Sequence, residues 1–211
     1  MPFTNVCFIS YRHGGQEHSR KLIESFYQTL AGQLDLYIPG SRVYLDARRL
    51  RGGDFFDQEL ASQLCRSVCM ILLFNPFYFD LSNPYCAREY RAMVELEQQR
   101  LGLLPQGAAQ RKSLIIPVVI RGEESLPEEL KRHRQYYSFA KTLLGPADFR
   151  QRRCMEHIFK IAGDIFDRYQ MFRSAGIDPC SQCDTFQFPT ELEIRDWLTE
   201  VVAPPQSMPG R

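Results

Sequence analysis

The chain has 211 residues, of which 44% are hydrophobic and 24% are charged, and these proportions are ordinary for a globular protein. Its length suits one substantial domain with an appendage. The 26 basic residues nearly balance the 25 acidic residues, so no general attraction to nucleic acid or to a membrane surface is expected. No apolar run approaches the roughly 18 residues of a membrane span, and the first residues lack the pattern of a secretory signal. We therefore expect a cytoplasmic protein.

Seven cysteines occur at irregular spacing, and such an odd, unpatterned set argues against a disulfide framework. Four of them lie in apolar or helical contexts, where a free thiol behaves as a small hydrophobe: Cys7, Cys65, Cys69 and Cys86. Cys180 and Cys183 form a single C-x-x-C pair. A zinc site would need further ligands, and only Cys154 and His157 precede the pair as candidates. We expect two reduced thiols in a loop.

Five short apolar runs predict the strands of a sheet: 6–11, 42–46, 68–74, 114–120 and 136–140. The first, third and fourth runs are continuously apolar, as is typical of strands that are covered on both faces. Pro117 lies inside the fourth run, and proline removes a donor from the hydrogen-bond ladder. We therefore expect a local irregularity in that strand.

Segments with helical periodicity separate these runs. Their apolar positions are Leu22, Phe26, Leu30 and Leu34; Phe55, Leu60 and Leu64; Tyr90, Met93 and Val94; and Ile158, Ile161, Ile165 and Tyr169. The third helix is expected to keep its Glu and Arg side chains on the solvated side, and segment 123–134 predicts only a weak helix. Strands that alternate with helices indicate an α/β fold, a flavodoxin-like doubly wound sheet of five parallel strands.

The composition changes near residue 172, which divides the chain into a domain, 1–172, and a C-terminal extension, 173–211. Residues 175–190 are turn-rich and aperiodic. Residues 191–202 predict a short amphipathic helix, and the remaining residues have the composition of a disordered tail. The apolar stripe of that helix is expected to consist of Leu192, Trp197, Leu198 and Val201.

Ligands of open α/β sheets bind outside the carboxyl ends of the strands, so the segments that leave each strand are the candidates. Arg12 and His13 follow the first strand and could hold a phosphate, although an ordinary solvated turn fits equally well. The second strand leads into a basic, glycine-bearing loop, 47–54. That loop is either a plain connection or a gate and interaction surface.

The third strand leads to a helix in which Asn83 is the expected cap and Glu89 lies in the first or second turn. Tyr85 precedes Glu89 by four residues, so both side chains share one helix face. An aromatic ring beside a carboxylate suits a planar heterocycle joined to a ribose. By itself, however, a glutamate early in a helix is often present only because the helix dipole favours it. His133 and His157 are expected at the surface.

Four ordered motifs resemble the Toll/interleukin-1 receptor (TIR) domain family: CFISYRH, VYLDARRLRGGDFFDQEL, ILLFNPFYF and SNPYCAREYRAM. The resemblance covers roughly residues 4–170. The chain departs from the common pattern at Val6, where an acidic residue is usual, and at Tyr85, where many members have tryptophan. Neither departure affects Glu89, which corresponds to the glutamate of the family's Cys-x-x-Glu segment.

The resemblance implies an NAD+ glycohydrolase that releases nicotinamide and forms ADP-ribose or a cyclic isomer, with Glu89 as the catalytic residue. It also implies a set of substrate-binding residues: Tyr11, Arg12, His13, Asp46, Arg48, Tyr85 and Cys86. NAD+ is then the substrate, and no metal or other cofactor is required. The short chain resembles prokaryotic defence members more than receptor tails, which suggests immune or antiphage signalling.

Self-association through loop 47–54 is a second implication of the resemblance, and two alternatives to an enzyme stay open. The domain could be a non-catalytic scaffold or adaptor that acts by TIR–TIR contact. It could instead bind a nucleotide signal without cleaving it. Enzymatic members of the family commonly become active on oligomerisation, so catalysis and assembly are compatible.

Overall fold

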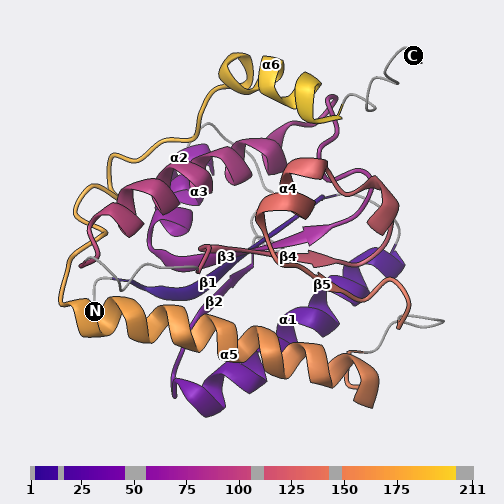
Figure 1. The fold of residues 1–211 in the computed structure, drawn as a ribbon, viewed down its shortest axis with the longest axis horizontal. Coiled ribbons are helices and arrows are strands. Elements are labelled where there is room, and N and C mark those ends of the chain that lie inside the picture. Colours follow the sequence, from indigo (N-terminus) through magenta and orange to yellow (C-terminus); the bar gives the residue numbers. More distant parts are fainter. Residues whose placement is uncertain (1–2, 14–16, 46–55, 106–111, 143–148, 203–211) are drawn as a thin grey trace, which may run out of the picture.

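A computed structural model describes residues 3–13, 17–45, 56–105, 112–142 and 149–202, which form a parallel sheet covered by helices on both faces (Figure 1). The strands are β1 (Asn5–Tyr11), β2 (Val43–Leu45), β3 (Ser67–Phe74), β4 (Ile115–Val119) and β5 (Tyr137–Ser138). Their order is β2-β1-β3-β4-β5 and every pairing is parallel. This order confirms the predicted flavodoxin-like, doubly wound sheet.

Two long helices, α1 (Glu17–Tyr37) and α5 (Arg152–Ala175), lie against each other on one face of the sheet (Figure 1). The opposite face carries α2 (Phe56–Cys65) and α3 (Tyr85–Gly102). The short elements η2 (Glu123–Ser125) and α4 (Glu128–His133) replace the predicted weak helix, and α6 (Glu191–Val202) matches the predicted final helix. No helix in the described residues is long and apolar enough to cross a membrane.

Pro117 does not disturb β4, so the predicted irregularity is wrong. The β3–β4 register runs without interruption from Met70↔Ile115 to Phe74↔Val119 and includes Leu72↔Pro117. Leu114 and Ile120 bond to β3, and because residues alternate along a strand, Pro117 turns its missing donor away from β3. Pairing with β5 begins only at Val118, so no ladder bond is lost there.

The charged residues of α3 are the largest departure from the predicted helix pattern. Arg88, Glu89, Glu97 and Arg100 are all buried, whereas a solvated side was expected for them. Arg100 donates hydrogen bonds to the carbonyl oxygens of Ser67 (2.8 Å) and Cys65. The hydrophobic periodicity of the sequence treats these residues as polar and therefore places them in solvent. It cannot show that groups distant in the sequence accept or donate the hydrogen bonds that make their burial possible.

A disulfide joins Cys65 at the end of α2 to Cys183 in the extension, which corrects the expectation of reduced thiols. The two cysteines are 118 residues apart in the sequence, so no local spacing pattern predicts their pairing. Cys180, the other member of the C-x-x-C pair, keeps a free thiol. Cysteine usage therefore no longer supports a reducing compartment.

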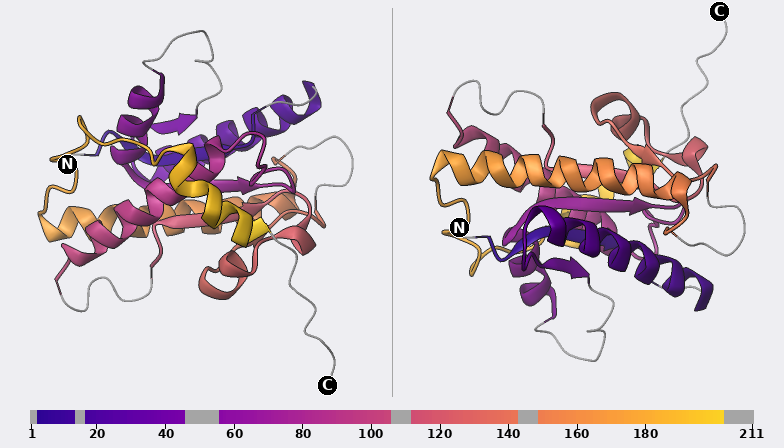
Figure 2. Two further views of the ribbon diagram at one scale, coloured as in Figure 1. Left: turned by 90° about the horizontal axis from the view of Figure 1, so that it is seen from above. Right: turned by 90° about the horizontal axis from the view of Figure 1, so that it is seen from below.

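The first residues of the extension, 173–175, still belong to α5, which ends at Ala175. Gly176 caps the helix, and its positive φ of 64° is typical of a glycine that terminates a helix. The chain then crosses the α2–α3 face and finishes in α6, which lies across α3 in the left-hand view of Figure 2. Trp197 and Leu198 pack inward as predicted, but Leu192 is 76% exposed and does not belong to the apolar stripe. The side chain of Val201 and the tail from residue 203 lie outside the described residues.

Candidate active site at the carboxyl edge of the sheet

β1 and β3 lie side by side, but the helices that follow them cover opposite faces of the sheet. This is the topological switch point, where open α/β sheets bind ligands. Successive side chains of β1 point to opposite faces. Ser10 accordingly contacts α3, whereas Tyr11 lines a cavity beside α1.

Glu89 lies in the second turn of α3 and is only 5% exposed. The hydroxyl of Ser10 donates a hydrogen bond to its Oε2 atom. The same hydroxyl lies 2.5 Å from the hydroxyl of Tyr78, which is fully buried. Tyr78, Ser10 and Glu89 therefore form a buried chain of hydrogen bonds that ends on a carboxylate oxygen.

Two neighbours of Glu89 are held in their neutral forms. Burial raises the pKa of Tyr78 well above its ordinary value, and electrostatic interaction with the nearby Cys86 and Glu89 raises it further. Burial also raises the pKa of the Cys86 thiol, with Glu89 as the next cause. Tyr78 thus keeps its proton, and its hydroxyl can donate a hydrogen bond to Ser10 while Ser10 donates to Glu89.

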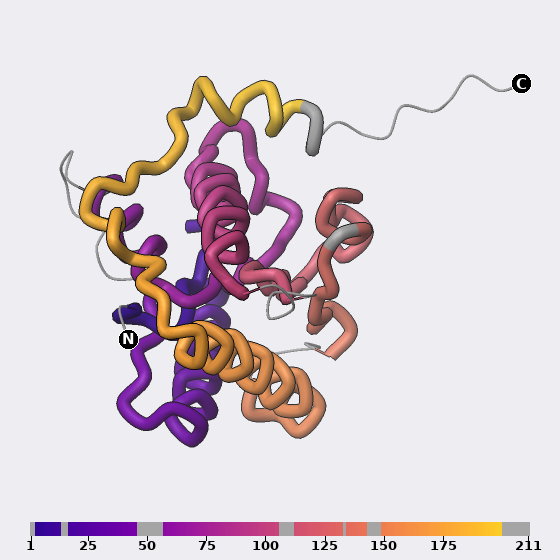
Figure 3. Tube along the Cα trace, turned by 60° about the vertical axis from the view of Figure 1, so that its left-hand side comes forward, coloured from indigo at the N-terminus to yellow at the C-terminus, as the bar shows by residue number. Residues whose placement is uncertain are grey.

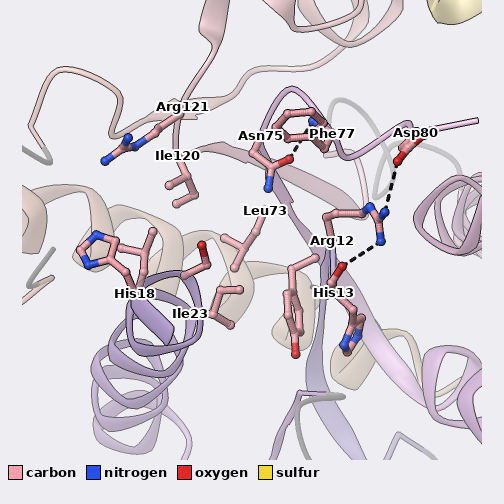
Figure 4. Close-up of a pocket in the computed structure, with 13 residues that line it drawn as sticks. Arg12, His13, His18, Ile23, Leu73, Asn75, Phe77, Asp80, Ile120 and Arg121 are labelled. Carbon is pink, nitrogen blue, oxygen red and sulfur yellow. Dashed lines mark hydrogen bonds and ion pairs between the residues drawn. The ribbon is translucent and has the colours of Figure 1, made fainter. Parts of the chain in front are cut away.

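A cavity of about 410 Å³ lies at the same edge of the sheet, on the side of α1, between the ends of β1, β3 and β4 and the start of α1 (Figure 4). Its lining includes Arg12, His13, His18, Phe77, Asp80 and Arg121. In Figure 4, Arg121 and His18 stand on one side of the cavity and Arg12 and His13 on the other. Cationic and aromatic side chains together suit an anionic ligand that carries a ring.

Arg12 is held in place from two directions. Its Nη2 atom lies 3.1 Å from Asp80 Oδ2, and its Nη1 atom donates to the carbonyl oxygen of His13 at 2.8 Å. Hydrogen bonds from Ser82 lower the pKa of Asp80, and Arg12 lowers it further, so Asp80 is charged at neutral pH. Within the described residues, no acceptor meets the buried Nε atom of Arg12.

The structure divides the predicted site residues into two groups. Tyr11, Arg12 and His13 gather at the cavity, and the rings of Tyr11 and His13 lie 4.3 Å apart. Cys86 and Glu89 are buried beside Ser10, on the other face of the sheet. Glu89 does not line the cavity.

Tyr85 lies at the surface, 41% exposed, with the Arg88 guanidinium 5.5 Å from its ring centroid. It begins α3, and its partial exposure leaves one part of the ring available to a ligand. The expected cap, Asn83, is wrong, because the N-cap is Pro84 and no side chain of the described residues caps the helix. Asp46, Arg48 and loop 47–54 lie outside the described residues.

Ser10 and Tyr78 are the site residues that the sequence patterns did not single out. Ser10 does carry a signal, because it is a small hydroxyl residue in the buried strand β1, between Ile9 and Tyr11. A polar residue at such a position needs a hydrogen-bond partner. The sequence cannot say that the partner is Glu89, which lies 79 residues away.

Comparison with known proteins identifies the wider relationship of this fold. A family model described as "TIR domain" matches residues 7–153, which extend from β1 to the start of α5. A protein of Brachypodium distachyon named "Probable 2' cyclic ADP-D-ribose synthase" is 27% identical over 135 residues. That alignment covers 63% of this chain, and the chain spans about 55% of the relative's length. The expected likeness to prokaryotic defence members stays a prediction.

Proposed function

Because this chain belongs to the TIR domain family, we propose that it breaks the bond between nicotinamide and ribose in NAD+. The observation that carries the proposal is the buried Glu89 carboxylate at the sheet's switch point, with Ser10 bonded to it. A buried carboxylate is costly unless it is paired or used.

Glu89 stabilises the positive charge that develops on the ribose as the bond to nicotinamide lengthens. Nicotinamide leaves without acid assistance, so one carboxylate is sufficient for this step. Ser10 and Tyr78 hold the carboxylate in one orientation. Such pre-organisation avoids reorganisation at the moment of reaction.

The two groups of site residues bind different parts of the substrate. Arg12 and His13 line the cavity and bind the pyrophosphate. The exposed ring of Tyr85 stacks on the nicotinamide ring, beside Cys86. The predicted contributions of Asp46, Arg48 and loop 47–54 remain part of the proposal.

The product depends on the group that attacks the ribose cation. Water gives ADP-ribose, whereas a hydroxyl of the substrate itself gives a cyclic isomer. The name of the Brachypodium relative refers to a 2' cyclic ADP-ribose, which favours the cyclic product for this chain as well. Liquid chromatography of the reaction mixture separates the two products.

Replacing Glu89 tests the proposal directly. Glu89→Gln keeps the size and one acceptor of the side chain but removes its charge, so NAD+ consumption is expected to fall at least about a hundredfold. The assay measures nicotinamide released by concentrated protein, with and without a crowding agent that promotes assembly. Glu95→Gln, at an exposed position of the same helix, is the matched control and is expected to retain full activity.

The proposal is wrong if Glu89→Gln consumes NAD+ as fast as the unaltered protein. It is also wrong if the unaltered protein releases no nicotinamide at any concentration or crowding. Calorimetry with NAD+ would then distinguish a protein that binds the nucleotide without cleaving it from one that does not bind it.

A scaffold function is supported by a different observation. The connection between β3 and α3 exposes two large apolar side chains, Phe77 (68%) and Leu81 (55%), and the exposed Tyr85 follows at the start of α3. Exposed apolar groups that lie close together mark interaction surfaces. Light scattering of Phe77→Ser and Leu81→Ser over a concentration series measures whether this surface carries self-association.

A further inference from the structure

The segment 176–202, here called the C-terminal strap, is attached to α2 at its first end. The disulfide joins its Cys183 to Cys65. Gln58 of α2 donates its Nε2 atom to the carbonyl oxygens of Asp184 and Phe186, each at 3.1 Å. Figure 3 follows the strap from the end of α5, past α2, to α6.

The middle of the strap contacts Arg88, the residue that precedes Glu89. Arg88 Nε donates to the carbonyl oxygen of Pro189 at 2.7 Å, and its guanidinium lies 5.7 Å from the ring centroid of Phe188. Arg88 Nη1 also lies 2.8 Å from Asp57 of α2. One side chain therefore joins the strap, α2 and the first turns of α3.

The far end of the strap rests on the same helix. Trp197 of α6 stacks on Tyr90 of α3 with ring centroids 5.5 Å apart and meets the edge of Phe79 at 5.8 Å. Ile194 and Leu198 are almost fully buried. The strap thus holds α3 on both sides of Glu89, at Arg88 and at Tyr90.

We propose that the C-terminal strap positions the turn of α3 that carries Glu89, that Arg88 is the positioning residue through which it acts, and that the Cys65–Cys183 disulfide keeps the strap docked. The part of this inference that concerns catalysis rests on the proposed function. The first turn of α3 has no side-chain cap in the described residues, so side-chain contacts with other segments add to its order. Arg88 provides them, and its guanidinium also packs on Tyr85.

Reduction of the disulfide releases the tether. A small dithiol transfers two electrons and two protons to the S–S bond, which yields the Cys65 and Cys183 thiols and a cyclic oxidised dithiol. The strap then keeps only its non-covalent contacts, and its free end samples many more conformations. Reoxidation restores the bond, so the change is expected to be reversible.

The fluorescence of Trp197 measures docking of the strap independently of enzymatic activity, because Trp197 is the only tryptophan in the sequence. Its emission is expected to shift to longer wavelength when the dithiol is added, since the ring leaves Tyr90 and Phe79 for water. The double variant Cys180→Ala/Cys183→Ala, in which no strap thiol can reach Cys65, is expected to show the shifted emission at once and no response to dithiol. Cys180→Ala alone keeps the disulfide and is the matched control.

Hydrogen exchange and enzyme kinetics test whether Arg88 positions the turn of α3 that carries Glu89. Arg88→Met keeps the length of the side chain but removes its donors, and kcat per folded molecule is expected to fall about tenfold. Amide exchange should rise in residues 85–90 and stay unchanged in β3, which distinguishes a local effect from general unfolding. Arg66→Met is the matched control, because Arg66 contacts the strap at Asp184, away from α3, and should retain activity.

The outcomes of these experiments test this inference independently of the proposed function. Unchanged Trp197 emission on reduction overturns the docking role of the disulfide. Unchanged exchange of residues 85–90 in Arg88→Met overturns the positioning role, whether or not NAD+ is consumed. If exchange rises but the NAD+ turnover of Arg88→Met equals that of Arg66→Met, while Glu89→Gln is inactive, the catalytic consequence is overturned and the proposed function stands.

Discussion

The two faces of the sheet are stabilised in different ways. On the α1–α5 face, aromatic rings fill the core: Phe26 lies 5.1 Å from Phe149 and 6.3 Å from Phe139, between ring centroids. On the α2–α3 face, buried charges of α3 are satisfied by specific partners. Glu97 meets Arg134 at 2.8 Å, and Arg100 meets the carbonyl oxygen of Ser67 at 2.8 Å.

This difference shows how strictly the partners of each side chain must be placed on each face of the sheet. Apolar burial has no direction, so any arrangement that removes those rings from water is favourable. A buried charge is favourable only when a partner of the right kind lies at the right distance and angle. The α1–α5 face therefore relies mainly on apolar contacts, although it holds one buried charge, Arg168, which donates to the carbonyl oxygens of Ser113 and Asp164. The α2–α3 face, which carries Glu89, relies more on buried charges of α3 and their specific partners.

The largest effect is expected for Phe26→Ala on the α1–α5 face. Phe26 is fully buried, and its loss leaves a cavity between the rings of Phe139 and Phe149. The free energy of unfolding should fall by about 3–5 kcal/mol, measured by urea denaturation. Leu36→Ala, at an exposed position of the same helix, should change it very little. A loss below about 1 kcal/mol for Phe26→Ala would show that this core is loosely packed.

A smaller loss, about 2–3 kcal/mol, is expected for Arg134→Met on the other face, because Glu97 is left charged and nearly buried. Arg132→Met, whose side chain is exposed, is the control and should cost less than about 1 kcal/mol. The double variant Arg134→Met/Glu97→Gln removes the unpaired charge and should be more stable than Arg134→Met. Equal stability of the two variants would mean that solvent reaches Glu97.

The smallest effect is a pH dependence of stability that comes from Glu97. Burial alone would raise the pKa of Glu97, but hydrogen bonds and the charge of Arg134, together with Ser113 and the Leu114 amide, lower it below 4.5. The stabilisation is therefore present above the unfolded pKa and lost as the pH falls through the lowered folded value. Urea denaturation between pH 7 and pH 3 should show a smaller loss for Glu97→Gln than for Glu95→Gln. Parallel curves would contradict the lowered pKa.

Much of the fold follows from patterns that the sequence displays. The buried strands β1 and β3 are continuous apolar runs, and the helices between strands have a clear period, so the order of elements and the parallel sheet could be predicted. The position of Glu89 beside the carboxyl edge followed from the same reasoning. Its assignment as the catalytic residue came from the family resemblance and remains a proposal.

Some of the features that could not be predicted involve pairs of distant residues, and others depend on the exact place where an element begins. The Cys65–Cys183 disulfide and the burial of Arg100 join segments that no local pattern connects. Asn83 was expected to cap α3 from its residue type, but the chain places Pro84 at that position. Pro117 was expected to disturb its strand, but the short β5 leaves no ladder bond for it to break.

The sequence by itself determined which segments become strands and helices, because hydrophobic periodicity and backbone propensity are local properties. It also determined that a glutamate lies near the start of the helix after the third strand. Only the tertiary structure decided that Ser10 and Tyr78 meet Glu89, and that the strap holds Arg88 beside it. These contacts depend on the direction and distance of groups far apart in the chain, and folding alone brings them together.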